Sequence, residues 1–135
     1  MGVAGTEEFI EKAHRYRKAY GGGMRQVGML AAACIFAVEN HFERLAEDHQ
    51  NARILAEGLN KIKIFDVPLS TVQTNIVIAN TNSESSNAYE IVNHIKKKGV
   101  LAIPFGSHKI RFVTHLNINR DDVTNTLELL NRIFK

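Results

Sequence analysis

The residues best suited to chemistry form the run Gly21-Gly22-Gly23-Met24-Arg25-Gln26. Glycine accepts positive φ and has no Cβ, so consecutive glycines suit a close approach of the backbone to a ligand, a second chain or another segment. We expect a helix to begin at Met24, and a glycine turn before a helix N-terminus offers free N–H groups that favour phosphate or carboxylate. Arg25 adds a positive charge in that first turn. These residues alone leave two alternatives, an anion site and a flexible hinge between two helices.

Basic side chains also precede the glycines, on a helix that we expect to begin after Thr6 and to end near Tyr20. One side of this helix carries the basic cluster His14, Arg15, Arg17 and Lys18. A solvated helix face and a binding surface both remain open for this cluster. The glycine run itself matches neither a P-loop nor a dinucleotide fingerprint, because no Gly-Lys-Ser/Thr follows and the glycines are not spaced.

A second candidate is Arg111, which lies inside the expected strand 109–115. Strand alternation places Ile110, Phe112 and Thr114 on one face and Arg111 on the other. Arg111 therefore lies either on a solvated face or in a cleft, and in a cleft its planar guanidinium would suit a carboxylate.

Other kinds of site have little support in the composition. The six histidines form no metal-ligand motif, and no serine nucleophile elbow or paired-carboxylate pattern is present, so we expect no metal. The net charge of +3 comes from interspersed charges without Trp, which argues against nucleic-acid binding. The longest apolar stretch, 27–38, is too short to span a bilayer. The single cysteine, Cys34, is expected to be a buried thiol in a cytoplasmic protein.

The elements that position these residues change in character along the chain. Residues 27–38 are apolar on every side, which is typical of a helix buried all round and predicts a partner surface that these residues cannot supply. Residues 42–59 form an amphipathic helix after a break near Asn40-His41, with Gly58 expected to close it. Asp48 and Asn51 are expected on its outer face. From residue 61 the order is β-β-α-β-β-α, a small α+β domain with helices on one face of a mainly antiparallel sheet.

Several segments, taken in order, resemble the low-specificity threonine aldolases, a pyridoxal phosphate (PLP) family of aminotransferase-like fold type I. The resemblance covers the whole chain. The segments are Gly5-Thr6-Glu7-Glu8-Phe9-Ile10, Arg15-Tyr16-Arg17-Lys18, Gly21-Gly22-Gly23-Met24-Arg25-Gln26, Glu43-Arg44-Leu45-Ala46-Glu47-Asp48-His49, Leu55-Ala56-Glu57-Gly58-Leu59, Gln73-Thr74-Asn75 and Arg111-Phe112-Val113-Thr114-His115-Leu116.

The resemblance implies an α/β enzyme of which this chain is the C-terminal part. Residues 1–58 would be the end of the large PLP domain with a connecting helix, and residues 59–135 the small C-terminal α+β domain. Lys18 and Arg25 match basic residues at the cofactor, with the arginine near the PLP phosphate and across a subunit boundary. Arg111 matches the arginine that binds the substrate carboxylate. The lysine that forms the Schiff base lies upstream in the family, so no catalytic residue is assigned in this chain.

The implied reaction is cleavage of threonine-type β-hydroxy-α-amino acids to glycine and an aldehyde, with PLP as electron sink. The isolated chain is expected to be inactive, and the complete enzyme to be a homo-oligomer. Two alternatives remain: a separately encoded half that complements an N-terminal chain, and a non-catalytic remnant kept as an oligomerisation or binding module.

Overall fold

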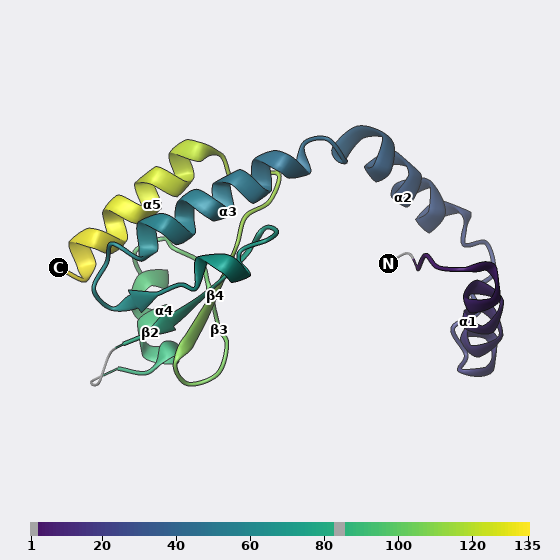
Figure 1. The fold of residues 1–135 in the computed structure, drawn as a ribbon, viewed down its shortest axis with the longest axis horizontal. Helices are drawn as coiled ribbons and strands as arrows, with labels where there is room; N and C mark the ends of the chain where they lie inside the picture. Colours follow the sequence, from purple (N-terminus) through teal and green to yellow (C-terminus); the bar gives the residue numbers. More distant parts are fainter. Residues whose placement is uncertain (1–2, 83–85) are drawn as a thin grey trace. The chain divides into compact units, whose positions relative to one another are not determined.

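Five α-helices and a four-stranded antiparallel sheet make up the computed structural model, which describes residues 3–82 and 86–135 (Figure 1). The chain divides into two compact units, Met1–His41 and Phe42–Lys135. They are packing units of this chain. The predicted boundary between residues 58 and 59 concerns the domains of a complete enzyme and stays a prediction.

The first unit consists of helices α1, Glu7–Ala19, and α2, Gly28–His41. Thr6 caps α1 as predicted, since its side-chain oxygen accepts a hydrogen bond from the Phe9 N–H at 3.3 Å. The predicted start of the second helix at Met24 is wrong, because α2 begins only at Gly28. Within the described part of the unit, neither helix has a buried residue.

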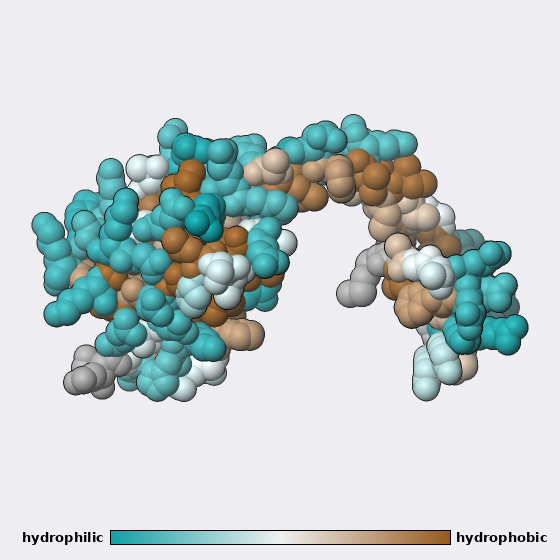
Figure 2. Space-filling model, in the orientation of Figure 1, coloured by the Kyte–Doolittle hydropathy of each residue, from teal (hydrophilic) through white to brown (hydrophobic). Residues whose placement is uncertain are grey.

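Helix α2 carries an exposed apolar surface, seen as brown side chains along its length (Figure 2). Its large apolar side chains are at least half exposed: Met29, Leu30, Ile35, Phe36 and Val38. Cys34 is also exposed, so the prediction of a buried thiol is wrong for this chain taken alone. A helix that is apolar all round is uncovered here because the described residues offer nothing to pack against it.

The second unit begins with helix α3, Leu45–Leu59, after the predicted break near residue 41. The order β-β-α-β-β-α that follows is confirmed, with one added 3-10 turn. Its elements are β1, Phe65–Asp66, η1, Leu69–Thr71, β2, Ile76–Thr81, α4, Ala88–Lys96, β3, Ile103–Pro104, β4, Lys109–Val113, and α5, Arg120–Ile133. The strands lie in the order β1-β2-β4-β3, and every pairing is antiparallel.

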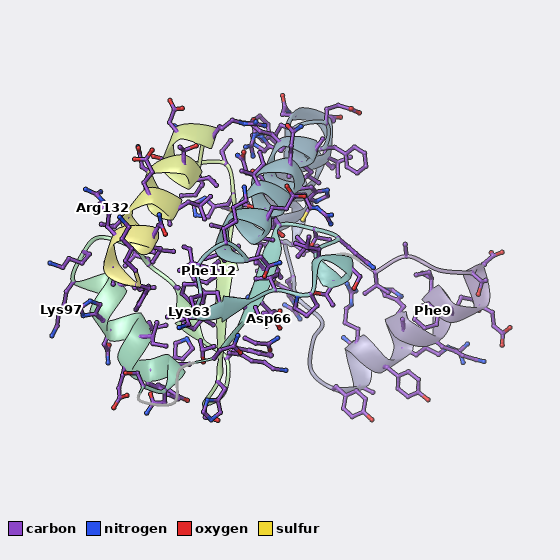
Figure 3. The ribbon with its side chains drawn as sticks, turned by 60° about the vertical axis from the view of Figure 1, so that its left-hand side comes forward. Phe9, Lys63, Asp66, Lys97, Phe112 and Arg132 are labelled. Carbon is purple, nitrogen blue, oxygen red and sulfur yellow. The ribbon has the colours of Figure 1, made fainter. Side chains whose placement is uncertain are left out.

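The core of this unit lies between one face of the sheet and the three helices α3, α4 and α5. Val77 and Ala79 of β2 pair with Phe112 and Ile110 of β4, and all four side chains are buried on this face. Phe112 lies in the interior between the sheet and the helices (Figure 3). The helices contribute apolar residues to the same cluster: Ala52, Leu55, Ala56, Leu59, Ile91, Val92, Ile95, Val123 and Leu130. The predicted arrangement, with helices on one face, is confirmed.

Gly58 has a different role from the predicted one. Helix α3 continues through Leu59, and Gly58 does not adopt the positive φ of a glycine that ends a helix. A Cβ placed on Gly58 would lie 2.9 Å from Cγ of Leu127 on α5 and closer still to both of its methyl groups. Gly58 therefore allows two helices to approach closely and does not end a helix.

Candidate functional site

The glycine run ends helix α1. Gly21 has a φ of 76° and donates its N–H to the Lys18 carbonyl at 3.2 Å, while the Gly22 N–H donates to the Arg17 carbonyl at 2.8 Å. This pair of bonds is the Schellman arrangement, in which a glycine in the left-handed region closes a helix. The N–H groups of Gly21 and Gly22 are thus used within the chain, and the prediction that they are free for an anion is wrong. An anion bound at this turn could not use those two N–H groups.

Basic side chains gather around a hollow of about 620 Å³ at this turn. The hollow is lined by the residues His14, Arg15, Arg17, Lys18, Ala19, Gly23, Met24 and Arg25. It brings together Lys18, from the last turn of α1, and Arg25, from the segment before α2. The two cofactor residues expected from the resemblance therefore line one surface of the first unit.

The basic side chains around the hollow form no ion pair with a carboxylate of the described residues. None of the ion pairs formed among residues 3–82 and 86–135 includes Arg15, Arg17, Lys18 or Arg25. The Arg17 side chain hydrogen-bonds another basic side chain, with its Nη2 atom 2.9 Å from Nε2 of His14. A group of unpaired cations around a concave surface attracts a multiply charged anion. The chemistry of these donors fits a phosphate group.

Arg111 lies on the sheet face opposite the core. Ile110 and Phe112, its neighbours in β4, are buried, which confirms the predicted alternation. Arg111 is paired with Ile78 of β2 on one side and with Ile103 of β3 on the other. The core cluster to which the described helices contribute lies on the other face of the sheet. On the face of Arg111, Ile103 and Val113 remain exposed.

The Arg111 side chain is partly buried, and part of its hydrogen-bonding capacity is unused. Its Nε atom is buried, and no described residue accepts a hydrogen bond from it. A buried donor without a partner is costly, and a guanidinium in apolar surroundings has a strong preference for a carboxylate. Arg111 belongs to the second unit, whereas Lys18 and Arg25 belong to the first.

Another hollow, of about 490 Å³, lies where β4 ends and α5 begins. Lys98, Phe112, His115 and Asn125 are among its lining residues, but Arg111 is not. It is therefore separate from the predicted carboxylate contact.

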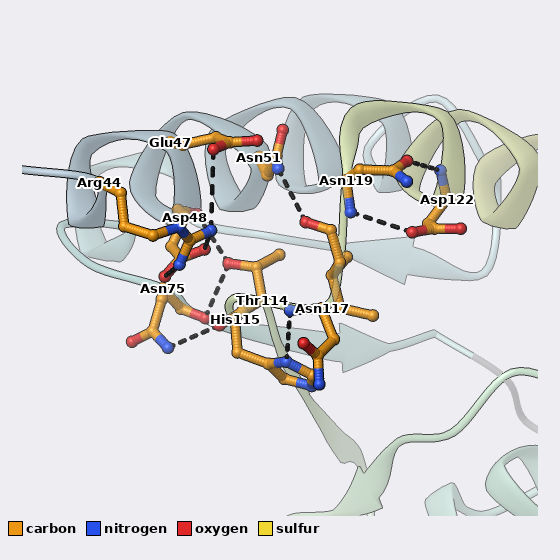
Figure 4. Close-up of polar contacts among 11 residues, drawn as sticks. Arg44, Glu47, Asp48, Asn51, Asn75, Thr114, His115, Asn117, Asn119 and Asp122 are labelled. Atoms are coloured by element: carbon orange, nitrogen blue, oxygen red, sulfur yellow. Dashed lines mark hydrogen bonds and ion pairs between the residues drawn. The ribbon is translucent and has the colours of Figure 1, made fainter. Parts of the chain in front are cut away.

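A polar network at the start of α3 was not predicted from the sequence. Asp48 and Asn51, which were expected on the outer face, are 4% and 1% exposed. The Asp48 carboxylate accepts two hydrogen bonds from the Arg44 guanidinium, at 3.0 and 3.1 Å, and the Asn51 amide donates to the Ile118 carbonyl at 3.1 Å (Figure 4). The spacing of Arg44 and Asp48, four apart on a helix, was the available signal for their pairing. The burial of Asp48 and Asn51 could not be predicted in this way, because both are hydrogen-bonded to residues more than sixty positions away.

No helix in the described ranges is both long and apolar enough to cross a membrane. No group of three or more His, Cys, Asp or Glu side chains in the same ranges is arranged to hold a metal ion.

Comparison with known proteins extends these observations. The family model for beta-eliminating lyases matches residues 2–82. The probable low-specificity L-threonine aldolase 2 of Arabidopsis thaliana is 39% identical over 133 residues, which cover 98% of this chain and 38% of that protein. The chain thus spans well under half the length of this relative.

Two solved structures share the fold. The 8-amino-7-oxononanoate synthase of Francisella tularensis matches 97% of this chain and 40% of its own, with a TM-score of 0.69 at 18% identity. A mutant of the lyase C-DES, with glycine covalently linked to its PLP cofactor, covers 77% of this chain and 28% of its own, with a TM-score of 0.61 at 19% identity. The similarity supports the mixed α/β architecture of fold type I PLP enzymes.

Proposed function

Because the chain belongs to the beta-eliminating lyase family, we propose that it is the C-terminal portion of a PLP-dependent threonine aldolase. The complete enzyme would cleave threonine-type β-hydroxy-α-amino acids to glycine and an aldehyde. The observation that best supports this role is the state of the Arg111 side chain. Its buried Nε has no hydrogen-bond partner among the described residues, and it lies on the sheet face opposite the core cluster.

Lys18 and Arg25 would hold the PLP phosphate. Both line the basic hollow of the first unit, where no carboxylate of the described residues pairs with them. When bound, PLP supplies an electron sink for the carbanion left on the glycine carbon. The contribution of Lys18 and Arg25 would be electrostatic anchoring, because fixed positive charges favour the doubly charged phosphate.

Arg111 would bind the substrate carboxylate through its planar guanidinium. Its neighbours Ile78 and Ile103 are apolar, so a carboxylate there would meet less competition from water than at a fully solvated arginine. Two parallel hydrogen bonds would fix the orientation of the α-carbon, and thereby of the bond to be cleaved.

The remainder of the active site would come from residues outside this chain, including the Schiff-base lysine. We propose a homo-oligomer in the cytoplasm in which Arg25 lies near the PLP of a neighbouring subunit. The exposed apolar surface of α2 supports assembly with further protein. The same surface also fits the second candidate, a half that complements an N-terminal chain or serves only in oligomerisation.

The test is product analysis with the PLP-loaded assembly that contains this chain. Incubation with threonine should release equal amounts of glycine and acetaldehyde, and the 135-residue chain alone should release neither. Serine and cysteine serve as comparison substrates for β-elimination. Pyruvate from these substrates without acetaldehyde from threonine would reject the aldolase in favour of an eliminating lyase, and no turnover of any substrate would favour the non-catalytic candidate.

A further inference from the structure

The paired strands β2 and β4 end in a mixed hydrogen-bond pair between Asn75 and Thr114. The Thr114 N–H donates to the Asn75 carbonyl at 3.0 Å, as in an ordinary antiparallel ladder. The reciprocal bond comes from a side chain, because the Asn75 Nδ2 donates to the Thr114 carbonyl at 2.7 Å (Figure 4). We call these two bonds the Asn75–Thr114 clamp.

A third bond ties the clamp to helix α3. The Thr114 hydroxyl, on a residue that is 1% exposed, donates to the Asp48 backbone carbonyl at 2.7 Å. Asp48 is itself held by the two hydrogen bonds from Arg44. The C-terminal end of β4 is thus fastened both to its partner strand and to the helix that packs on the core face.

The clamp fixes the register that determines where Arg111 points. Thr114 shares the buried face with Ile110 and Phe112, and Arg111 lies on the opposite face. Side chains alternate along a strand, so a slip of one residue would turn Arg111 into the core and bring Thr114 out. Correct placement of Arg111 therefore depends on holding β4 against β2.

The other edge of β4 gives little support at this end. On this edge β4 pairs with β3, with Ile103 opposite Arg111 and Pro104 opposite Ile110. Within the described residues this pairing does not extend to Thr114. After Arg111, the strand is held by β2, by the clamp and by the core. The Asn75 side chain therefore bonds β4 at the end where that strand is paired with β2 but no longer with β3.

We propose that Asn75 and Thr114 are positioning residues for Arg111, holding its guanidinium in the geometry that receives a carboxylate. This inference rests on the proposed role of Arg111 in binding the substrate carboxylate. Neither positioning residue needs to touch substrate or cofactor. Asn75 belongs to the segment Gln73-Thr74-Asn75, to which no other role is assigned.

The test is a double-mutant cycle in the PLP-loaded assembly that contains this chain. Asn75→Ala should raise KM for threonine roughly 2- to 13-fold, the worth of one neutral hydrogen bond, with little change in kcat or PLP affinity. In an Arg111→Ala background the same substitution should add almost nothing, because Asn75 acts through Arg111. Thr114→Val should behave like Asn75→Ala, whereas Thr114→Ser, which keeps the hydroxyl, should restore a nearly normal KM.

A matched control and a second readout separate positioning from general damage. Asn87→Ala removes an asparagine that caps α4, so it should destabilise the same unit without changing KM. Hydrogen exchange on the full 135-residue chain should show faster exchange in 109–114 for Asn75→Ala and unchanged exchange in α4.

Three results would overturn the inference, and they separate the positioning role from the proposed role of Arg111. Equal KM increases from Asn75→Ala in both backgrounds, or unchanged exchange in 109–114, would show that Asn75 does not act through Arg111. A normal KM for Arg111→Ala alone would instead remove the proposed function of Arg111, and the positioning role with it.

Discussion

Replacement of Arg111 tests the substrate-carboxylate contact most directly. Loss of a hydrogen bond to a charged group is typically worth about 1.5–3 kcal/mol, which corresponds to a decrease of roughly 10- to 150-fold in kcat/KM. Because the Arg111 Nε is buried beside apolar neighbours, we expect Arg111→Ala to fall in the upper part of that range. Arg111→Lys keeps the charge but loses the planar pair of donors, so it should fall near the lower end.

The assay combines threonine cleavage kinetics with PLP titration of the same variants in the complete assembly. If the carboxylate contact has the same strength in the ground state and the transition state, the loss appears mainly in KM. PLP affinity should hardly change, since Lys18 and Arg25 are assigned to the phosphate. Arg132→Ala is the matched control, because it removes an exposed arginine from α5 of the same unit and should leave kcat/KM unchanged.

Stability provides an independent check on the Arg111 variants. The unpaired Nε makes Arg111 costly to the fold, so Arg111→Met should leave Tm unchanged or raise it while activity falls. Near wild-type kcat/KM for Arg111→Ala, or a loss of PLP binding that accounts for the whole effect, would refute the assignment. A large fall in Tm for Arg111→Met would show that the Arg111 side chain has a partner within the protein and is not free to bind a ligand.

The full 135-residue chain, purified alone and saturated with PLP, should carry no PLP on a lysine after borohydride reduction, because none of its lysines matches the Schiff-base motif. A pyridoxyl group mapped to Lys18 or to another lysine would contradict this. The chain alone should also self-associate at micromolar concentration, since the apolar side chains of α2 are uncovered, and a well-folded monomer in sedimentation velocity would be the contrary result. Gly58→Ala should lower the free energy of unfolding in urea by about 1–3 kcal/mol, because the new Cβ would overlap Leu127. Leu127→Ala added to Gly58→Ala should recover part of that loss, and no recovery would mean that the overlap is not its cause.

Much of the local structure could be predicted because its signals lie within a few residues. Asn87 and Glu90, three residues apart, form a capping box at the start of α4, in which the Asn87 side-chain oxygen accepts a hydrogen bond from the Glu90 N–H at 3.1 Å. Thr6 and Asn119 likewise cap the helices that follow them. The face on which Arg111 lies followed from strand alternation, because one buried face is enough to fix the other.

Most of the errors concern residues whose environment is set by distant parts of the chain. Asp48 and Asn51 look like ordinary polar surface residues in a helical pattern, but they are buried and hydrogen-bonded to residues that follow β4. Gly58 looked like a helix end, but Leu127 of α5 explains it. The run from Gly21 was interpreted as a helix start, whereas its bonds complete the helix before it. For Asp48, Asn51 and Gly58 the deciding contact was not local. At Gly21 the deciding bonds are local, but the pattern was compatible with both a helix end and a helix start.

The strand order of the sheet has a consequence for folding kinetics. The central pair, β2 and β4, is separated in the chain by α4 and β3, so this pairing requires closure of a long loop. Helices α4 and α5 each begin with a capping box and can start to form without such closure. The rate-limiting step should therefore be the meeting of β2 with β4. Substitutions in that pair should slow folding, and loss of a helix cap should slow it too, because a helix that forms before this step keeps its cap in the transition state.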